Sequence, residues 1–293
     1  MSAQGIRPAI SRRHLIRTGA AAALVAASGL ALRAEPGPSG VLRLAAPGRL
    51  PGPEGANGVL GRLVAPGSVF DCLAEIGPDG GLMGELAESW EPQNGGAVWA
   101  VTLRDGAEFH DGRSFQADDA VVSLRYHMAA AADRLGIVSV RKAKRLQIVI
   151  TLESPDPGFP FLLSDPSLMM LPADDPVGAL RHGIGTGLYR INDAQTGMRL
   201  ERVAAHYKDG RAGWFEALEL VGIEDAKERT RGLLAGRFDA VAAPDPGVQR
   251  KHGGKQRFID VATPSRRHLQ IRCRGDNAGP LAAALKLGLD RYA

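Results

Sequence analysis

Two pairs of titratable residues stand close enough in the sequence to suggest metal binding or acid–base catalysis. His110 and Asp111 belong to a turn-like run that ends in glycine, and Asp118 with Asp119 follows shortly after. A metal site requires several convergent ligands in a set geometry. A turn at His110-Asp111 and a helix N-terminus at Asp118-Asp119, where carboxylates offset the helix dipole, account for the same four residues. We therefore predict no metal site and no catalytic group here.

A glycine-rich segment, Gly183-Ile184-Gly185-Thr186-Gly187, is the next candidate for chemistry, because backbone N–H groups of such segments can cradle a phosphate. Phosphate binding of this kind needs a helix N-terminus directly after the glycines. The residues that follow, Leu188-Tyr189-Arg190-Ile191, are typical of a strand. The sequence also lacks a G-x-S-x-G elbow, a P-loop and an H-E-x-x-H motif. We predict that the protein is not an enzyme and holds no cofactor.

The charge of the chain is unevenly placed. The formal net charge of +4 owes much to five arginines within residues 1–34, which contain no Asp or Glu, so the remainder is close to neutral. Aromatic residues make up only 5% of the chain, which leaves few rings for stacking on bases. A near-neutral body with few aromatics does not indicate a polyanionic partner, and we predict that the protein binds no nucleic acid.

Residues 1–34 have the three-part form of an export signal. Ser11-Arg12-Arg13-His14-Leu15-Ile16 resembles the twin-arginine signal, and an apolar stretch runs from Gly19 to Leu32. This stretch is shorter than the roughly 20 residues that span a bilayer, which disfavours an uncleaved anchor, while an ordinary secretory signal is the other alternative. Because no cysteine follows within reach, we predict a soluble periplasmic protein and not a lipoprotein.

The rest of the chain alternates between strand and helix patterns. Residues 35–67 are rich in Pro and Gly and indicate loop around a short strand at 41–44. Further patterns predict strands at 98–103, 146–152, 188–191, 198–203, 218–223 and 238–242, and helices at 117–132 and 226–234. The fold class expected from this alternation is mixed α+β.

Several motifs then occur in a characteristic order. They are Leu86-Ala87-Glu88-Ser89-Trp90, Leu103-Arg104-Asp105-Gly106 with Phe109-His110-Asp111-Gly112, Ala117-Asp118-Asp119, Gly185-Thr186-Gly187-Leu188-Tyr189, Leu234-Ala235-Gly236 with Asp239, and Leu285 to Arg291. Together they resemble the family 5 extracellular solute-binding proteins of ABC transporters, the peptide- and nickel-binding group. The resemblance covers roughly residues 41–293. It departs from the family pattern at Leu188, which replaces a proline, and at Ala205-His206, which replace part of an Asn-bearing stretch.

The resemblance implies a periplasmic binding protein type II-like clamshell. Residues 68–293 correspond mainly to the first lobe, with an inserted subdomain at about 70–180. In the family the chain continues well beyond the segment that matches Leu285 to Arg291, so we expect this sequence to stop before the second lobe.

The resemblance also implies a function. It predicts a periplasmic substrate-binding component that captures peptide-like or nickel-chelate ligands and delivers them to an ABC permease in the inner membrane. In the family, the loop at Phe70-Asp71 and the Gly185-Thr186-Gly187 elbow lie near the cleft between the lobes, so these five residues are the predicted ligand-binding residues. The alternative is a half-clamshell that binds no solute independently and acts, if at all, through another chain.

Two cysteines, Cys72 and Cys273, would meet an oxidising compartment after export. They could pair only if their Cα atoms lie within roughly 7 Å, which spacing along the chain does not show. Two reduced, buried thiols are the default expectation.

Overall fold

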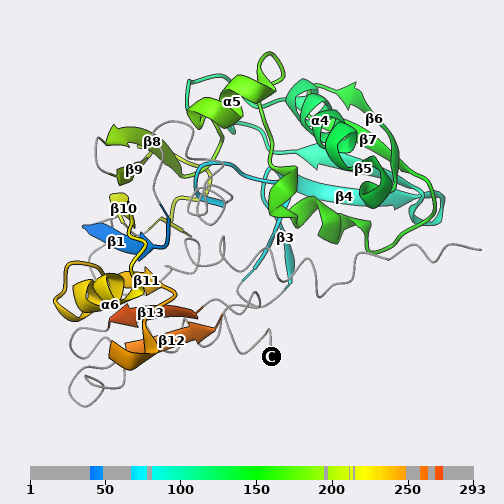
Figure 1. The fold of residues 1–293 in the computed structure, drawn as a ribbon. Coiled ribbons are helices and arrows are strands. Elements are labelled where there is room, and N and C mark those ends of the chain that lie inside the picture. The colour runs from blue at the N-terminus through cyan, green and yellow to red at the C-terminus, as the bar shows by residue number, and fades with distance from the viewer. Residues whose placement is uncertain are drawn as a thin grey trace, which may run out of the picture.

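The computed structural model describes residues 40–48, 67–77, 81–194, 197–210, 212–213 and 215–248, together with the backbone of two strands at 258–262 and 268–272. Within these ranges the chain forms three β-sheets with helices packed on them (Figure 1). The predicted signal at 1–34 and most of the Pro/Gly-rich segment lie outside the described residues.

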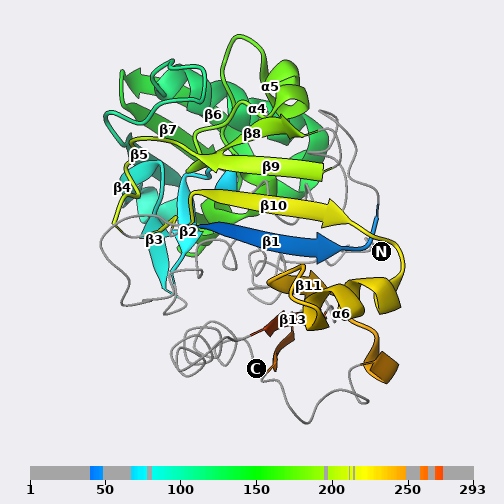
Figure 2. The same cartoon turned by 90° about the vertical axis from the view of Figure 1, so that its left-hand side faces the viewer.

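The largest sheet has seven strands in the order β12-β13-β11-β1-β10-β9-β8. The strands are β1 (Val41–Ala46), β8 (Tyr189–Ala194), β9 (Gly197–Arg202), β10 (Ala217–Gly222), β11 (Ala240–Ala242), β12 (Phe258–Ala262) and β13 (His268–Arg272). Strand β1 is central and pairs in parallel with both β10 and β11, whereas the outer pairs are antiparallel. Figure 2 shows β1, β10, β9 and β8 side by side in that order.

A second, four-stranded antiparallel sheet is built entirely from chain between β1 and β8. Its order is β4-β5-β7-β6, with β4 (Ala87–Gln93), β5 (Val98–Leu103), β6 (Ile137–Lys144) and β7 (Gln147–Leu152). Alternate residues of β5 and β7 are buried against helix α4 (Ala117–Leu135), because side chains in a strand point to opposite faces in turn. This sheet and α4 form a layer beside the main sheet, and we call it the inserted layer (Figure 1).

Short elements make up much of the remaining described chain between β1 and β8. A two-stranded sheet pairs β2 (Ala74–Ile76) with β3 (Leu82–Gly84), and three 3-10 helices lie at Asn94–Gly96, Phe159–Ser164 and Pro166–Leu168. Helix α5 (Pro176–His182) begins where the Asp175 side chain accepts a hydrogen bond from Gly178 N, and it ends at Gly183, whose φ is 69°. Such a left-handed C-cap turns the chain back toward β8.

Helix α6 (Ala226–Leu234) follows β10 and is anchored by a buried arginine. The Arg229 guanidinium donates to the carbonyl oxygens of Ile223, Glu224, Ala242 and Ala243 at 2.5–3.0 Å. It therefore supplies donors to carbonyls just beyond β10 and at the end of β11. These contacts fix the ends of two strands that flank β1.

The sequence-based expectations agree with this fold in their main lines. The mixed class is confirmed, the helix predicted at 117–132 is α4, and the strands predicted at 98–103 and 146–152 are β5 and β7. Strands β4 and β6 were missed, because most of their side chains are exposed and their sequences show no regular apolar alternation. In the described part of the chain, no helix is both long and apolar enough to cross a membrane.

Candidate functional site

The two segments predicted to bind ligand are in direct contact. Gly187 N donates to Val69 O at 2.9 Å, and Thr186 Oγ1 donates to Asp71 Oδ2 at 3.2 Å. A Cβ atom at Gly185 would lie only 1.9 Å from Val69 O, and one at Gly187 would lie 2.3 Å from Ser68 O. The elbow therefore needs glycine for close backbone approach.

Most of the predicted ligand-binding residues lie in the interior. Phe70 and Asp71 are fully buried, Thr186 is 1% exposed, and Gly185 is buried as well. Gly187 is the member of the set that lines a pocket. Contact of these five residues with a ligand stays a prediction.

Asp71 belongs to a buried charged group that we call the Lys208 cluster, made of Asp71, Glu75, Glu85, Tyr207 and Lys208. The Lys208 ammonium donates to Asp71 Oδ1 at 3.0 Å, to Glu75 Oε2 at 3.4 Å, and to Glu85 Oε1. The Tyr207 hydroxyl donates to Asp71 Oδ2 at 2.7 Å. Lys208 is 5% exposed, so its three protons are used within the protein.

The protonation states in this cluster follow from burial and from Lys208. Burial raises the pKa of the Asp71 carboxyl, but the Lys208 ammonium and the hydrogen bonds outweigh it and hold that pKa at about 2. Burial also raises the pKa of Glu85, and here Lys208 only partly offsets it, so the pKa stays well above its ordinary value. The single buried cation thus favours ionisation of Asp71 more strongly than ionisation of Glu85.

The turn at His110 holds the elbow from the other side. His110 Nε2 lies 2.8 Å from Gly187 O, and the His110 backbone N–H donates to Gly185 O at 2.9 Å. Asp119 instead caps α4, where Oδ2 accepts from Gln116 N at 2.8 Å, and Asp118 pairs with Lys142 at 2.5 Å. The turn and helix-terminus interpretation of these four residues is thereby confirmed. No group of possible metal ligands occurs within the described residues.

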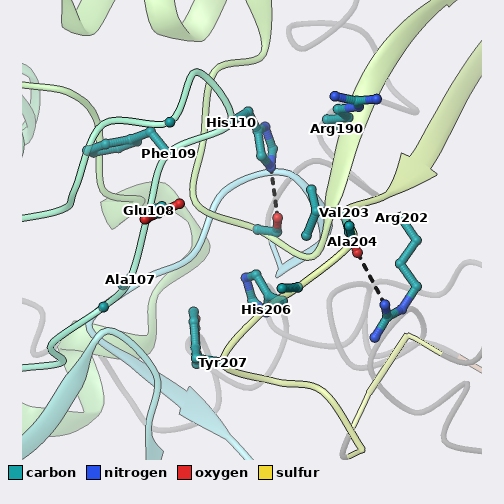
Figure 3. A pocket seen from close by; sticks show the side chains of 14 residues that line it. Ala107, Glu108, Phe109, His110, Arg190, Arg202, Val203, Ala204, His206 and Tyr207 are labelled. Atoms are coloured by element: carbon teal, nitrogen blue, oxygen red, sulfur yellow. Dashed lines mark hydrogen bonds between the residues drawn. The ribbon is translucent and has the colours of Figure 1, made fainter.

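A pocket of about 370 Å³ opens between the inserted layer and the main sheet (Figure 3). One wall is the turn at 106–112, and the facing wall is the chain that leaves β9, residues 202–207. Gly187 and Arg190 complete the lining. The volume falls within the range of small-molecule sites.

Cys72 is a free thiol buried beside the cluster. Its Sγ donates to Asp165 O at 3.3 Å, and burial followed by the nearby Glu85 charge raises the pKa of the thiol well above its usual value. Such a thiol is unreactive, because the thiolate is the nucleophile. Cys273 lies outside the described residues.

Sequence reasoning placed Asp71 in the site but missed its partners. Glu85, Tyr207 and Lys208 come from distant segments, and no spacing in the sequence connects them to Asp71. The signal that the sequence did offer was the position of these charged residues beside segments that the resemblance covers. Glu85 directly precedes the Leu86 motif and Lys208 follows closely after Ala205-His206 in a stretch that the resemblance covers, so both charges border segments that fold inward.

Comparison with known proteins identifies the family. Residues 81–285 match the model described as bacterial extracellular solute-binding proteins, family 5, middle, and the chain belongs to this family. The glutathione-binding protein GsiB of Pectobacterium atrosepticum is 28% identical over 283 residues, covering 89% of this chain and 52% of GsiB. The nickel-binding periplasmic protein of Escherichia coli is 27% identical over 148 residues, covering 46% of this chain and 28% of that protein.

A solved structure supports the same fold. The binding protein AgaA of Agrobacterium tumefaciens R10, in complex with agropinic acid, superposes with a TM-score of 0.65 at 21% identity. The match covers 76% of this chain and 48% of AgaA. The fold is therefore that of the type II periplasmic binding proteins, and this chain spans about half the length of the first curated relative it matches.

Replacing Lys208 tests the cluster directly. Lys208→Met leaves Asp71 and Glu85 buried without their cation, so we expect a loss of about 3–5 kcal/mol in the free energy of unfolding at pH 7. The control is Lys142→Met, which breaks an exposed ion pair with Asp118 and should cost less than about 1 kcal/mol. Urea unfolding followed by circular dichroism measures both, and equal small losses would contradict the role of Lys208.

Glu85 gives a test in pH. Because its folded-state pKa is raised, its contribution to stability is full below its ordinary pKa of 4.5 and is lost as the pH rises through the folded-state value. Glu85→Gln removes this titration while Asp71 keeps its partner Lys208. The variant should therefore gain stability relative to wild type between pH 5 and pH 8, as measured by urea midpoints. The exposed Glu91→Gln is the control, and parallel curves for Glu85→Gln and wild type would refute the assignment.

Proposed function

We propose that this chain is a substrate-binding component of an ABC importer for peptide-like or nickel-chelate ligands. The observation that carries the proposal is the family match over residues 81–285, a range that contains every residue lining the pocket. The relatives named above support the ligand class, because their names refer to glutathione and nickel.

The proposed mechanism is capture without chemistry on the ligand. A clamshell protein holds its ligand between two lobes that close about a hinge, and the closed form docks on a membrane permease. Binding alone requires shape, hydrogen-bonding groups and exclusion of water, not a nucleophile or an acid–base pair. In the pocket, His110 and His206 bond to carbonyl oxygens of the elbow and the Tyr207 hydroxyl bonds to Asp71, so these side chains hold the pocket wall in shape.

We further propose that Phe70, Asp71, Gly185, Thr186 and Gly187 form the ligand-facing wall of this lobe. Gly187 lies on the pocket with its N–H bonded to Val69 O, and behind it Thr186 Oγ1 donates to Asp71 Oδ2. A wall fixed in this way loses little conformational entropy when a ligand binds, which favours affinity.

Ligand-induced stabilisation of the purified full chain tests the function. A protein that binds ligand in its native state gains about 2.7 kcal/mol at a ligand concentration 100 times the Kd. We expect a rise in melting temperature with reduced glutathione, with a di- and tripeptide mixture, or with the nickel–histidine chelate. Maltose and free histidine serve as controls. A chain unaffected by the whole panel contradicts independent capture and favours the half-clamshell alternative.

We propose that the protein reaches the periplasm by the twin-arginine route. Changing Arg12 and Arg13 together to lysine keeps the charge of the signal but removes the arginine pair. Cell fractionation should then find the variant in the cytoplasm and the wild type in the periplasm. Arg7→Lys is the matched control, and periplasmic accumulation of the double variant would refute this route.

A further inference from the structure

His206 holds the glycine elbow with a ring whose two nitrogens have fixed and different roles. Its Nε2 lies 2.8 Å from the Thr186 carbonyl oxygen, which can only accept a hydrogen bond, so Nε2 carries a proton. Its Nδ1 accepts a hydrogen bond from the Lys208 backbone N–H at 3.1 Å, so Nδ1 carries none. The two bonds together require the neutral ring with its proton on Nε2.

Protonation of this ring is incompatible with the position that it occupies. A charged ring carries an N–H on Nδ1 as well, and this N–H would point at the Lys208 backbone N–H, so that two donors face each other. The side chain of His206 is only 6% exposed, which adds the cost of a buried charge. A protonated ring therefore has to leave its place beside the elbow.

The charges around His206 do not offset this cost in full. Asp71 Oδ2 lies 3.9 Å from Nε2 and Asp209 also favours a charged ring, whereas the Lys208 ammonium opposes it. Burial is the largest influence, and it lowers the pKa of His206 below its ordinary value of 6.5. The other charged or titratable groups nearby are Glu85 in the Lys208 cluster, Arg104 over the Tyr207 ring, and Glu108, His110 and Arg202 on the pocket wall.

His110 bonds to the same elbow in an arrangement that tolerates protonation (Figure 3). Its Nε2 lies 2.8 Å from Gly187 O and its Nδ1 lies 3.3 Å from Gly183 O, so a charged ring can donate to both carbonyl oxygens. The contact that it would lose is a long one, 3.4 Å, from Gly185 N. The two histidines that hold the elbow therefore differ in their response to acid.

We propose that His206 is an acid-released latch on the glycine elbow. The neutral ring holds Thr186 O, and the protonated ring moves into the pocket that it lines, where water can solvate its charge. The neighbouring Ala204 and Ala205 are exposed, so this segment has room to turn. The wall of the pocket is then firm near neutral pH and loose in acid. The inference does not depend on the importer function, because every bond involved lies within the described residues.

Nuclear magnetic resonance of the full chain, labelled with ¹⁵N-histidine, tests the protonation states. The imidazole ¹⁵N shifts distinguish the two neutral tautomers from the charged ring, and the signal that is missing from His206→Gln identifies His206. We expect the Nε2–H tautomer at pH 7.5 and a titration with its midpoint below 6.5. The Nδ1–H tautomer, or a midpoint at or above 6.5, would overturn the proposal.

Hydrogen exchange of the elbow measures the release itself. After correction for intrinsic rates, protection of the peptide that covers residues 184–190 should fall at least fivefold between pH 7.5 and pH 5 in the wild type. His206→Gln keeps an N–H that can donate to Thr186 O but cannot be protonated, so its protection should not change over this range. The exposed His182→Gln is the matched control and should behave like the wild type. Constant protection in the wild type, or the same fall in His206→Gln, would contradict the latch.

The titration of Glu85 has the opposite sign, so the two groups can be told apart. Because the folded-state pKa of His206 is lowered, its contribution to stability is full above 6.5 and is lost as the pH falls through the folded-state value. The contribution of Glu85 is lost as the pH rises. An elbow that becomes better protected in acid would therefore indicate Glu85 and would contradict the role of His206.

Discussion

The Lys208 ammonium, buried between carboxylates, is the interaction on which the arrangement of the two layers depends. It brings together the loop before β2, the turn after β3 and the segment after β9, which belong to different parts of the chain. Removing a charge from water costs several kcal/mol, and only nearby opposite charges recover that cost. These segments must therefore come together for any of them to be stable. The buried contacts of Lys208 therefore hold the main sheet and the inserted layer together at their junction.

The glycine elbow shows how that fixed junction shapes the surface. Gly185 and Gly187 let the elbow lie directly on the backbone of residues 68–70, while His110 bonds to it from the turn of the inserted layer. Held on both sides, the elbow presents Gly187 to the pocket as rigid backbone. Contacts that lie mostly in the interior thus determine the form of a wall that faces solvent.

The sequence predicts the regular parts of this molecule better than its junction. Strand β5 and helix α4 show clear apolar periodicity, so both were expected close to their observed positions. Asp71 and the elbow were chosen through the resemblance, and the structure shows that they are in contact with each other, while their contact with a ligand stays a prediction. Their link to Lys208 and Glu85 was not foreseeable, because a lone charged residue normally indicates an exposed side chain. Only the three-dimensional contact shows that these charges neutralise one another in the interior.

The topology of the main sheet has a consequence for how the chain folds. Strand β1 pairs with β10, with Val41 opposite Ala217. The chain that forms the inserted layer lies between these two strands in the sequence, so their pairing closes a long loop. Closing so long a loop carries an entropic cost that no contact repays until late, whereas the inserted layer joins strands that are near neighbours in sequence. We therefore expect the inserted layer to fold first, with β1 still unpaired until β10 and β11 reach it. A strand in that state exposes open hydrogen-bonding edges, so we expect the aggregation risk of this sheet to lie in β1 itself, Val41–Ala46.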